Sequence, residues 1–525
     1  MFLPLVLALG CGGSAGSLTI AAPVDTGAGD DVNHDPDVDT GQADSECDPF
    51  RPSAVTSEYA LATTEWRTDQ SRTDDNPLKG FLTSYLWSEP ANDFPDSMEF
   101  LYLPMSSLWD ASGDTFDAGL EPLLDAAEAR AHHVVLRVYL DYPTKPSGVP
   151  DYLAETVGCT PYSEHGGGCS PDYEHPDLKA AILEFIGALG ERYDGDPRLG
   201  FVQVGLLGFW GEWHTWPHTE MFPTASMQTD VLDAFVDAFV FTHLQIRSPA
   251  ANSVDLRMGF HDDSFAYSTL GDIDWFFWPG LITAGADERW QDVPIGGELR
   301  PELQSQVFED SYTLDTYAQD VATCVDVTHT TYLLNYWAFS GDGVGYVGEA
   351  RARAQQVARD MGYEFTLSGA SLSVGGLGED GVDGTVQLEL TATGVAPFYY
   401  PLTPVLVDQA TGAAVATAET VPALLPGDSL TVEFDLNRVA PQTFGGPLVL
   451  DLQSPVLMAA QRIQLPTITP WTEAGSATAV SWSLGCEGPS DRLRVGAVVE
   501  VDGQACECRC DVDGRLRDAA GAVCL

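Results

Sequence analysis

The sequence predicts an α/β fold: a (β/α)8 TIM barrel, then an all-β immunoglobulin-like sandwich and a small cysteine-rich C-terminal segment. Three observations lead to this prediction. Between about residues 64 and 362, eight apolar strand-like runs alternate with amphipathic helical runs. Between about residues 363 and 467, short runs alternate apolar and polar positions, with Gly, Pro and Asp at the breaks. Five cysteines then crowd the last forty residues.

The barrel strands are expected at runs rich in Val, Ile, Phe, Tyr and Trp. These runs are residues 80–86, 100–105, 134–140, 202–210, 254–259, 275–278, 293–298 and 331–337. Amphipathic helices are expected at 118–131, 177–193, 226–246, 301–324 and 348–361. An open doubly wound sheet is the alternative. No glycine-rich nucleotide-binding motif follows a strand, which weakens the nucleotide-binding versions of that sheet.

Changes in composition set the expected domain boundaries. They give a signal or lipobox segment at 1–11, a disordered acidic linker at 12–60, the barrel as catalytic domain at 61–362, the sandwich as accessory domain at 363–468, and the cysteine-rich tail at 469–525.

The charge balance excludes several classes of partner. The 525 residues include 24 Lys and Arg against 78 Asp and Glu, which gives a formal net charge of −54. No basic surface exists to displace counterions from phosphates, so no nucleic-acid partner is expected. Electrostatic binding to anionic membranes is excluded for the same reason. With 44% hydrophobic residues the chain can still build a large core.

The N-terminus indicates export. Its first ten residues, MFLPLVLALG, resemble the apolar core of a secretion signal. The run ALGC resembles a bacterial lipobox, which makes Cys11 the expected lipidation site; an ordinary signal peptide is the alternative. We therefore expect an exported protein, lipid-anchored in a bacterial cell envelope or extracellular, that touches the membrane only through this anchor. The Asp-rich run that follows does not match a calcium loop.

The ten cysteines fit an oxidising compartment. Cys159 and Cys169 lie ten positions apart in a Gly-rich run, which predicts a local disulfide. Further disulfide candidates occupy the tail: Cys486, Cys506, Cys508, Cys510 and Cys524. Because five is an odd number, one of them pairs elsewhere or stays free. Zinc is the rival for the C-x-C-x-C run, although its spacing is tighter than usual zinc pairs. No cofactor and no metal are expected.

Two glutamates are the candidate catalytic residues, because reactive groups in a barrel belong at the carboxyl ends of strands. Glu212 ends candidate strand four among three tryptophans, in the run GFWGEWHTW. An apolar setting raises a carboxyl pKa, as a general acid requires; a salt-bridged Glu in a Trp-rich loop is the alternative. Glu298 ends candidate strand seven after two glycines that allow close backbone approach. Its alternative is a helix N-terminal acid, because Pro301 follows.

Polar and aromatic residues at the other strand ends are candidates for substrate binding. An inward Arg can hold a neighbouring Glu ionised, although a structural Arg–Asp pair on the third strand is the alternative. A His beside two acids ends the fifth candidate strand, and a Trp that could equally be core follows the eighth. The candidates are Arg137, Asp141, Trp210, Trp213, His214, His261, Asp262, Asn335 and Trp337.

Four runs resemble one bacterial family, the domain-of-unknown-function 4832 family. They are NPLKGF, ERYDGDPRL, GLLGFWGEWHT and PIGGEL, and the resemblance covers about residues 64–362. It implies a secreted, glycosidase-like barrel. The chain also looks distantly like the large retaining-glycosidase clan, which implies Glu212 as acid/base and Glu298 as nucleophile. That clan has Asn before the strand-four Glu, whereas this chain has Gly211.

The expected function is therefore hydrolysis of a poly- or oligosaccharide by two carboxylates, with a carbohydrate as partner. A surface lipoprotein that binds glycan without cleaving it is the alternative, in keeping with Gly211. A third, weaker hypothesis is a metal-dependent hydrolase that uses His214, His261 and Asp262. Aromatic rings that stack on sugar rings suit the first two hypotheses.

Overall fold

The computed structural model describes residues 76–465, apart from 88, 341–343, 379–380, 409–410 and 440–446, together with seven short strands outside that range. Cys11 and most of the expected acidic linker lie outside the described residues. The side chains of the tail cysteines Cys486, Cys506, Cys508, Cys510 and Cys524 also lie outside them. Among the helices that are described, none is long and apolar enough to cross a membrane.

The predicted (β/α)8 barrel is confirmed. Its eight parallel strands follow one another around the sheet in the order β3-β14-β13-β12-β11-β10-β7-β4. A bridge between Thr83 and Glu99 joins the two end strands and closes the barrel. The strands are β3 (Gly80–Leu82), β4 (Met98–Pro104), β7 (His133–Asp141), β10 (Leu199–Phe209), β11 (His243–Ile246), β12 (Met258–Phe265), β13 (Ile295–Leu299) and β14 (Tyr332–Leu334).

Helices cover the outside of the barrel and bury their apolar stripes against it. They are α1 (Phe116–Gly119), α2 (Glu121–Ala129), α3 (Asp151–Val157), α4 (Pro176–Tyr193), α5 (Ala225–Ala238), α6 (Phe277–Ala284), α7 (Val321–Thr328) and α8 (Gly348–Asp360). The longest, α4, begins with Pro176 at its first turn, as the sequence predicts. It buries Leu178, Ile182, Phe185 and Ile186 in the barrel core.

Two expected helices and two expected strands differ from the structure. The expected helix at 226–246 stops at Ala238, and its last four residues form the fifth strand, β11. No Gly or Pro separates the helix from that strand, so the apolar spacing runs on without a visible break. The aromatic run at 275–278 enters helix α6 and is not a strand. Residues 254–259 only touch the start of β12, which is therefore the sixth strand. The expected helix at 301–324 forms mainly turns before α7.

The predicted β-sandwich follows the barrel. One sheet contains β15 (Phe365–Gly378), β16 (Gly381–Ala392), β19 (Ser429–Val439) and β2 (Ser57–Ala60). The other contains β17 (Thr403–Asp408), β18 (Ala414–Thr417), β20 (Pro447–Gln453), β21 (Thr478–Trp482) and β1 (Leu5–Leu7). Exposed and buried positions alternate along most of β19, which is why its sequence reads as a half-buried strand. Residues 57–60, expected in the linker, add a strand to the first sheet.

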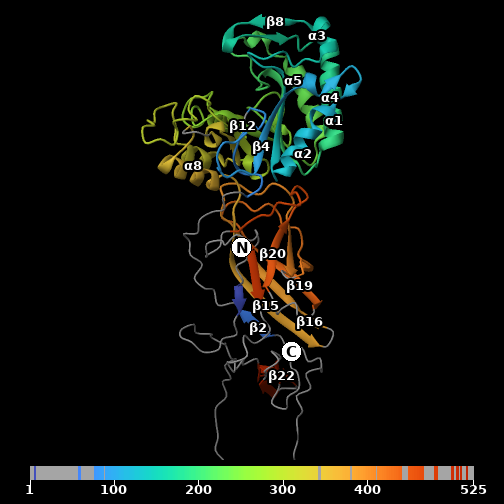
Figure 1. The fold of residues 1–525 in the computed structure, drawn as a ribbon, viewed down its shortest axis with the longest axis vertical. Coiled ribbons are helices and arrows are strands. Elements are labelled where there is room, and N and C mark those ends of the chain that lie inside the picture. Colours follow the sequence, from blue (N-terminus) through green and yellow to red (C-terminus); the bar gives the residue numbers. More distant parts are fainter. Residues whose placement is uncertain are drawn as a thin grey trace, which may run out of the picture.

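The sandwich side of the molecule closes the amino ends of the barrel strands (Figure 1). His133 begins β7, and its Nε2 bonds to the carbonyl of Val456 at 2.9 Å. The Tyr400 hydroxyl donates to the carbonyl of Gly200 at 2.5 Å, near the start of β10. His243 begins β11, and its Nε2 bonds to the carbonyl of Tyr399 at 3.0 Å. The carboxyl ends of the strands therefore face away from the sandwich.

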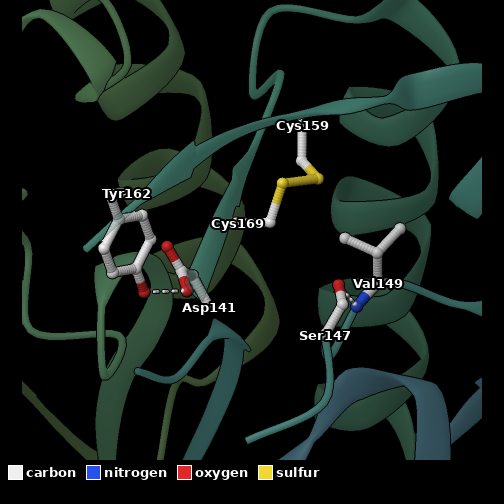
Figure 2. The surroundings of a disulfide bond; sticks show 6 residues. All are labelled: Asp141, Ser147, Val149, Cys159, Tyr162 and Cys169. Atoms are coloured by element: carbon white, nitrogen blue, oxygen red, sulfur yellow. Dashed lines mark hydrogen bonds between the residues drawn. A yellow bond between two sulfur atoms is a disulfide. The ribbon is translucent and has the colours of Figure 1, made fainter. Parts of the chain in front are cut away.

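A disulfide hairpin lies at the end of the barrel farthest from the sandwich (Figure 1). Its strands are β8 (Cys159–Tyr162) and β9 (Gly168–Pro171). The Cys159–Cys169 disulfide joins them, which confirms the pairing predicted from their spacing. The Tyr162 hydroxyl donates to Asp141 Oδ1 at 2.7 Å, so the last residue of β7 holds the hairpin (Figure 2).

Candidate active site

Five ionisable side chains meet at the carboxyl-end side of the barrel. Arg137 points inward from β7, and Asp263 from β12. Glu212 follows the end of β10, Arg247 directly follows β11, and Glu298 lies on β13. Strands far apart in the sequence therefore contribute to one cluster, because all eight are parallel and end on the same side.

Arg137 is the centre of this cluster. Its Nε donates to the side-chain oxygen of Gln203 at 2.7 Å, and its Nη2 donates to Asp263 Oδ2 at 2.8 Å. Its Nη1 lies 3.4 Å from Glu212 Oε1. The guanidinium is buried and lies over the ring of Tyr102, with 5.2 Å between the Arg137 Cζ and the ring centroid. A buried charge needs such partners, so Arg137 is fixed in place.

Arg247 is a second cation that the sequence analysis missed. Its Nε lies 3.7 Å from Glu212 Oε2 and 3.5 Å from Asp263 Oδ2, and its Nη1 lies 3.5 Å from Asp262 Oδ1. The residue directly follows HLQI, a run that the sequence predicts as the end of a helix. The available signal was an arginine directly after a short run that alternates polar and apolar residues, the pattern of a strand.

Glu212 faces three cationic or titratable partners. Beside the two arginines, His214 Nε2 lies 3.5 Å from Glu212 Oε2. The Glu212 side chain keeps 15% of its surface exposed, whereas Asp262 and Asp263 keep 1% and 2%. Glu212 therefore lies within ion-pair distance of two arginines and is still reached by solvent.

Glu298 has the opposite surroundings. Among the residues that the structure describes, no cation lies within ion-pair distance of it; the Gln304 side-chain amide lies 3.5 Å from its Oε1. Burial raises the pKa of Glu298 well above its ordinary value, and the negative charges of Asp263 and Glu212 raise it further. Glu298 therefore holds a proton where an unperturbed Glu would have lost it.

Asp263 has a pKa shift opposite to that of Glu298. Burial alone would raise the pKa of Asp263, but the charge of Arg137, followed by His261, outweighs burial and lowers that pKa. His261 Nδ1 lies 3.0 Å from Asp263 Oδ1. The cluster thus combines Glu298, whose pKa is raised, with Asp263, whose pKa Arg137 holds below its ordinary value.

Glycines shape both strand ends. Gly211 has a φ of +64°, and a Cβ there would lie 3.2 Å from the backbone of Leu206 and of Val138. A side chain at this position would be crowded, so the turn that carries Glu212 is built on glycine. A Cβ on Gly296 would lie 2.4 Å from the Tyr332 ring. The close backbone approach predicted before Glu298 is therefore confirmed.

Three residues that were expected to bind substrate instead make contacts within the fold. Trp213 is buried in the barrel core and its Nε1 donates to the carbonyl of Val204 at 2.7 Å, so it cannot stack on a sugar. Asp141 holds the disulfide hairpin through Tyr162. Asn335 is buried, and its side-chain nitrogen lies 3.3 Å from the Tyr346 hydroxyl. A residue near a strand end can face either the core or the site, and the local sequence does not show which of the two it faces.

The remaining substrate-binding candidates contact different parts of the barrel. Trp210 is partly buried, with its ring centroid 4.8 Å from that of His165 on the hairpin. His214 contacts Glu212, as given above. His261 and Asp262 lie on the sixth strand, not the fifth, and both are buried, so they orient charged neighbours. Trp337 packs against the cluster of buried side chains beneath α8.

In the described part of the chain, no group of three His, Cys, Asp or Glu side chains is arranged to hold a metal ion. The proposed metal ligand His261 turns its Nδ1 to Asp263 and Arg137. The metal-dependent hypothesis therefore finds no ligand set among these residues.

A polar network below the charged cluster was also missed. Gln203 accepts from Arg137, and its Nε2 donates to the Tyr332 hydroxyl at 3.0 Å. The Tyr332 hydroxyl donates in turn to Gln245. The sequence signal was a Gln in the middle of an apolar strand run, since a buried amide needs partners. This network ties β10, β11 and β14 together and fixes Arg137 from below.

No protein-family profile matches the chain, and no curated protein sequence matches it. Membership of the domain-of-unknown-function 4832 family therefore stays a prediction. Several solved structures are similar at low identity. An endoglucanase is 10% identical with a TM-score of 0.29, over 54% of this chain and 97% of that chain. A family 39 glycoside hydrolase from Bacteroides cellulosilyticus is 10% identical with a TM-score of 0.32, over 70% and 82%.

A GH29 α-L-fucosidase from Bacteroides thetaiotaomicron is 12% identical with a TM-score of 0.26, over 65% of this chain and 79% of that chain. TM-scores in this range carry no functional inference.

Proposed function

We propose that this protein is a glycoside hydrolase in which Glu212 and Glu298 are the two catalytic carboxyl groups. One observation carries the proposal. Two carboxyls at the ends of β10 and β13 share one electrostatic environment, in which burial raises the pKa of Glu298 and two arginines lie beside Glu212. When their surroundings give two carboxyl groups different pKa values, the group with the higher pKa serves as the acid and the other as the base or nucleophile. A pair of carboxyls in these two states is what cleavage of a glycosidic bond requires.

The charge distribution favours the reverse of the roles that the family resemblance implies. Glu298, with its raised pKa, is the proton donor to the leaving oxygen. Glu212, held by Arg137 and Arg247, is the nucleophile that attacks the anomeric carbon and forms a glycosyl ester. The Glu298 carboxylate then takes a proton from the water that attacks this ester. The sugar leaves, the Glu212 carboxylate is regenerated, and Glu298 is protonated again.

Leaving-group chemistry separates the two roles. From an aryl glycoside with a strongly acidic phenol, the phenolate leaves with little help from an acid. A natural sugar leaving group must instead receive a proton from an acid as the bond breaks. Glu298→Gln should therefore slow bond cleavage on an oligosaccharide by about 10²–10⁴-fold, while formation of the glycosyl ester from a dinitrophenyl glycoside continues. Glu212→Gln should abolish turnover of both substrates. Glu184→Gln, an exposed carboxyl on α4, is the matched control.

The test requires a screen of dinitrophenyl glycosides and oligosaccharides with the full chain. The opposite pattern, with ester formation kept in Glu212→Gln and lost in Glu298→Gln, would restore the roles implied by the resemblance. Equal activity of both variants and the unmodified protein would refute the hydrolase. If the unmodified protein binds glycan and turns over none of the substrates, the non-catalytic glycan-binding barrel is the function, the alternative that Gly211 raised.

We also propose that the protein is exported and anchored through Cys11, or secreted. The supporting observations are the apolar N-terminal run and the Cys159–Cys169 disulfide, which is typical of an oxidising compartment. Labelling of expressing cells with a palmitate analogue tests the anchor, because Cys11→Ala should remove the label. Label retained in that variant would contradict a lipid attached to Cys11.

A further inference from the structure

Three aromatic rings lie on the loops that follow β12 and precede α6 and α7. The ring of Tyr267 stacks on that of Tyr317 at 5.2 Å between centroids and 24° between planes. The rings of Tyr317 and Trp275 are 6.3 Å apart and 29° from parallel. Trp275 is 64% exposed and Tyr317 is 38% exposed. We call these three rings the aromatic platform.

The aromatic platform is joined to the catalytic strands. Tyr267 comes two residues after the last residue of β12, and Arg300 comes two residues after Glu298. The Arg300 guanidinium lies over the Tyr267 ring at 3.8 Å, and its backbone N–H donates to the carbonyl of Phe265 at 3.2 Å. The platform therefore starts at the strand ends that carry Asp263 and Glu298 and continues outward.

The two loops of the aromatic platform are locked together. Gln319 accepts a hydrogen bond from the backbone of Leu270 at 2.8 Å and donates one back to its carbonyl at 2.6 Å. Asp315 Oδ1 accepts from the backbone N–H of Tyr317 at 2.8 Å. Buried Phe276 supports both exposed rings, with centroids 4.7 Å from Trp275 and 5.6 Å from Tyr317. The exposed rings are therefore held in fixed positions before any ligand arrives, which lowers the entropic cost of binding.

We propose that Trp275 and Tyr317 bind the pyranose rings of a neutral polysaccharide chain that extends outward from Glu298. This inference rests on the proposed function for the direction of the chain. The apolar C–H face of a pyranose matches an exposed indole or phenol ring, while its hydroxyls stay in water. The exposed parts of the Trp275 and Tyr317 rings are the apolar surface on which such a pyranose face can pack.

The charges around the aromatic platform select against acidic glycans. Asp272, Asp274 and Asp315 are exposed on the same two loops, and the whole chain carries a net charge of −54. A polyuronate or sulfated chain would bring like charges together. Arg300 is the cation at the inner end, and it is already paired with Glu302 at 3.0 Å. A neutral glycan is therefore the occupant that these residues accept.

Affinity electrophoresis in native gels tests the proposal with the full chain. The gels contain soluble mixed-linkage β-glucan, arabinoxylan or galactomannan, with polygalacturonate as the acidic comparison. We expect at least one neutral polysaccharide to retard the protein, and Trp275→Ala or Tyr317→Ala to weaken that binding about tenfold. Trp275→Phe should restore part of it. Polygalacturonate should cause no retardation.

Two control variants test for an effect of the loop itself. Leu314→Ala removes an exposed apolar side chain three residues before Tyr317, and Tyr152→Ala removes an exposed ring on α3. Both should keep full retardation. Equal retardation of Trp275→Ala and the unmodified protein would overturn the proposal. It would also be overturned by loss of retardation in Leu314→Ala, by retardation only in polygalacturonate, or by no retardation in any gel.

Binding and catalysis are separated by Glu298→Gln. If this variant and the unmodified protein are both retarded and neither turns over a glycoside, the aromatic platform stands and the hydrolase fails. If the protein cleaves glycosides but Trp275→Ala binds and cleaves the polysaccharide normally, the hydrolase stands and the platform fails.

Discussion

Acidification should weaken the junction between the barrel and the sandwich, because two buried histidines there are neutral. His133 Nε2 bonds to the carbonyl of Val456, and its Nδ1 accepts from the Gln461 amide at 3.0 Å. Only a neutral ring can donate at one nitrogen and accept at the other. His243 Nε2 bonds to the carbonyl of Tyr399. Burial lowers the pKa of both histidines from 6.5 to about 4.

The magnitude follows from those pKa values. Below pH 6.5 the two histidines bind protons in the unfolded chain but stay neutral in the folded chain. The free energy of unfolding therefore falls as the pH falls. The loss continues down to about pH 4, where the folded histidines also become protonated. At pH 5 each histidine costs about 2 kcal/mol. Together they remove about 4 kcal/mol, a large part of the stability of a typical domain.

Urea unfolding at pH 7, 6 and 5 measures this loss. The acidic chain has many other groups that titrate, so the informative quantity is the difference between the unmodified protein and His133→Gln/His243→Gln. Between pH 7 and pH 5 the unmodified protein should lose about 4 kcal/mol more than this double variant, and each single variant should show about half the effect. Parallel pH dependence of all four proteins would refute the reasoning.

Three further predictions concern stability. Arg137→Met should cost about 3–5 kcal/mol in urea unfolding, because it removes the closest cation of the buried Asp263 carboxylate, at 2.8 Å, and leaves Arg247 at 3.5 Å; adding Asp263→Asn should recover part of that loss, and no recovery would contradict the pairing. Phe201→Ala should cost about 3–5 kcal/mol, because the ring is buried between two tyrosines at the barrel floor; a loss below about 1 kcal/mol would show that the floor collapses into the space. Opening the Cys159–Cys169 bridge by Cys159→Ser/Cys169→Ser should destabilise its short loop by about 3 kcal/mol and expose the hairpin to limited proteolysis. Unchanged cleavage would show that the contacts of the hairpin with the barrel hold it without the disulfide.

The local patterns that require only neighbouring residues were predictable. Alternation of apolar runs with amphipathic helices gave the barrel, and period-two alternation gave the sandwich. The ten-residue spacing of Cys159 and Cys169 gave the disulfide. The glycines before Glu298 indicated a crowded strand end, which the Tyr332 ring occupies. Each of these signals reflects a constraint that acts within one segment of the chain.

The amino-acid sequence by itself determined the fold class and the two glutamates at the ends of strands four and seven. Only the tertiary structure decided their electrostatic states. Arg247 and Asp263 reach Glu212 and Glu298 from other strands, and the pKa of a carboxyl depends on charges and burial in space. The tertiary structure also decided that Trp213 faces the core whereas Trp275 faces solvent. Burial is a property of the packed chain, and local sequence does not fix which face of a loop the packing covers.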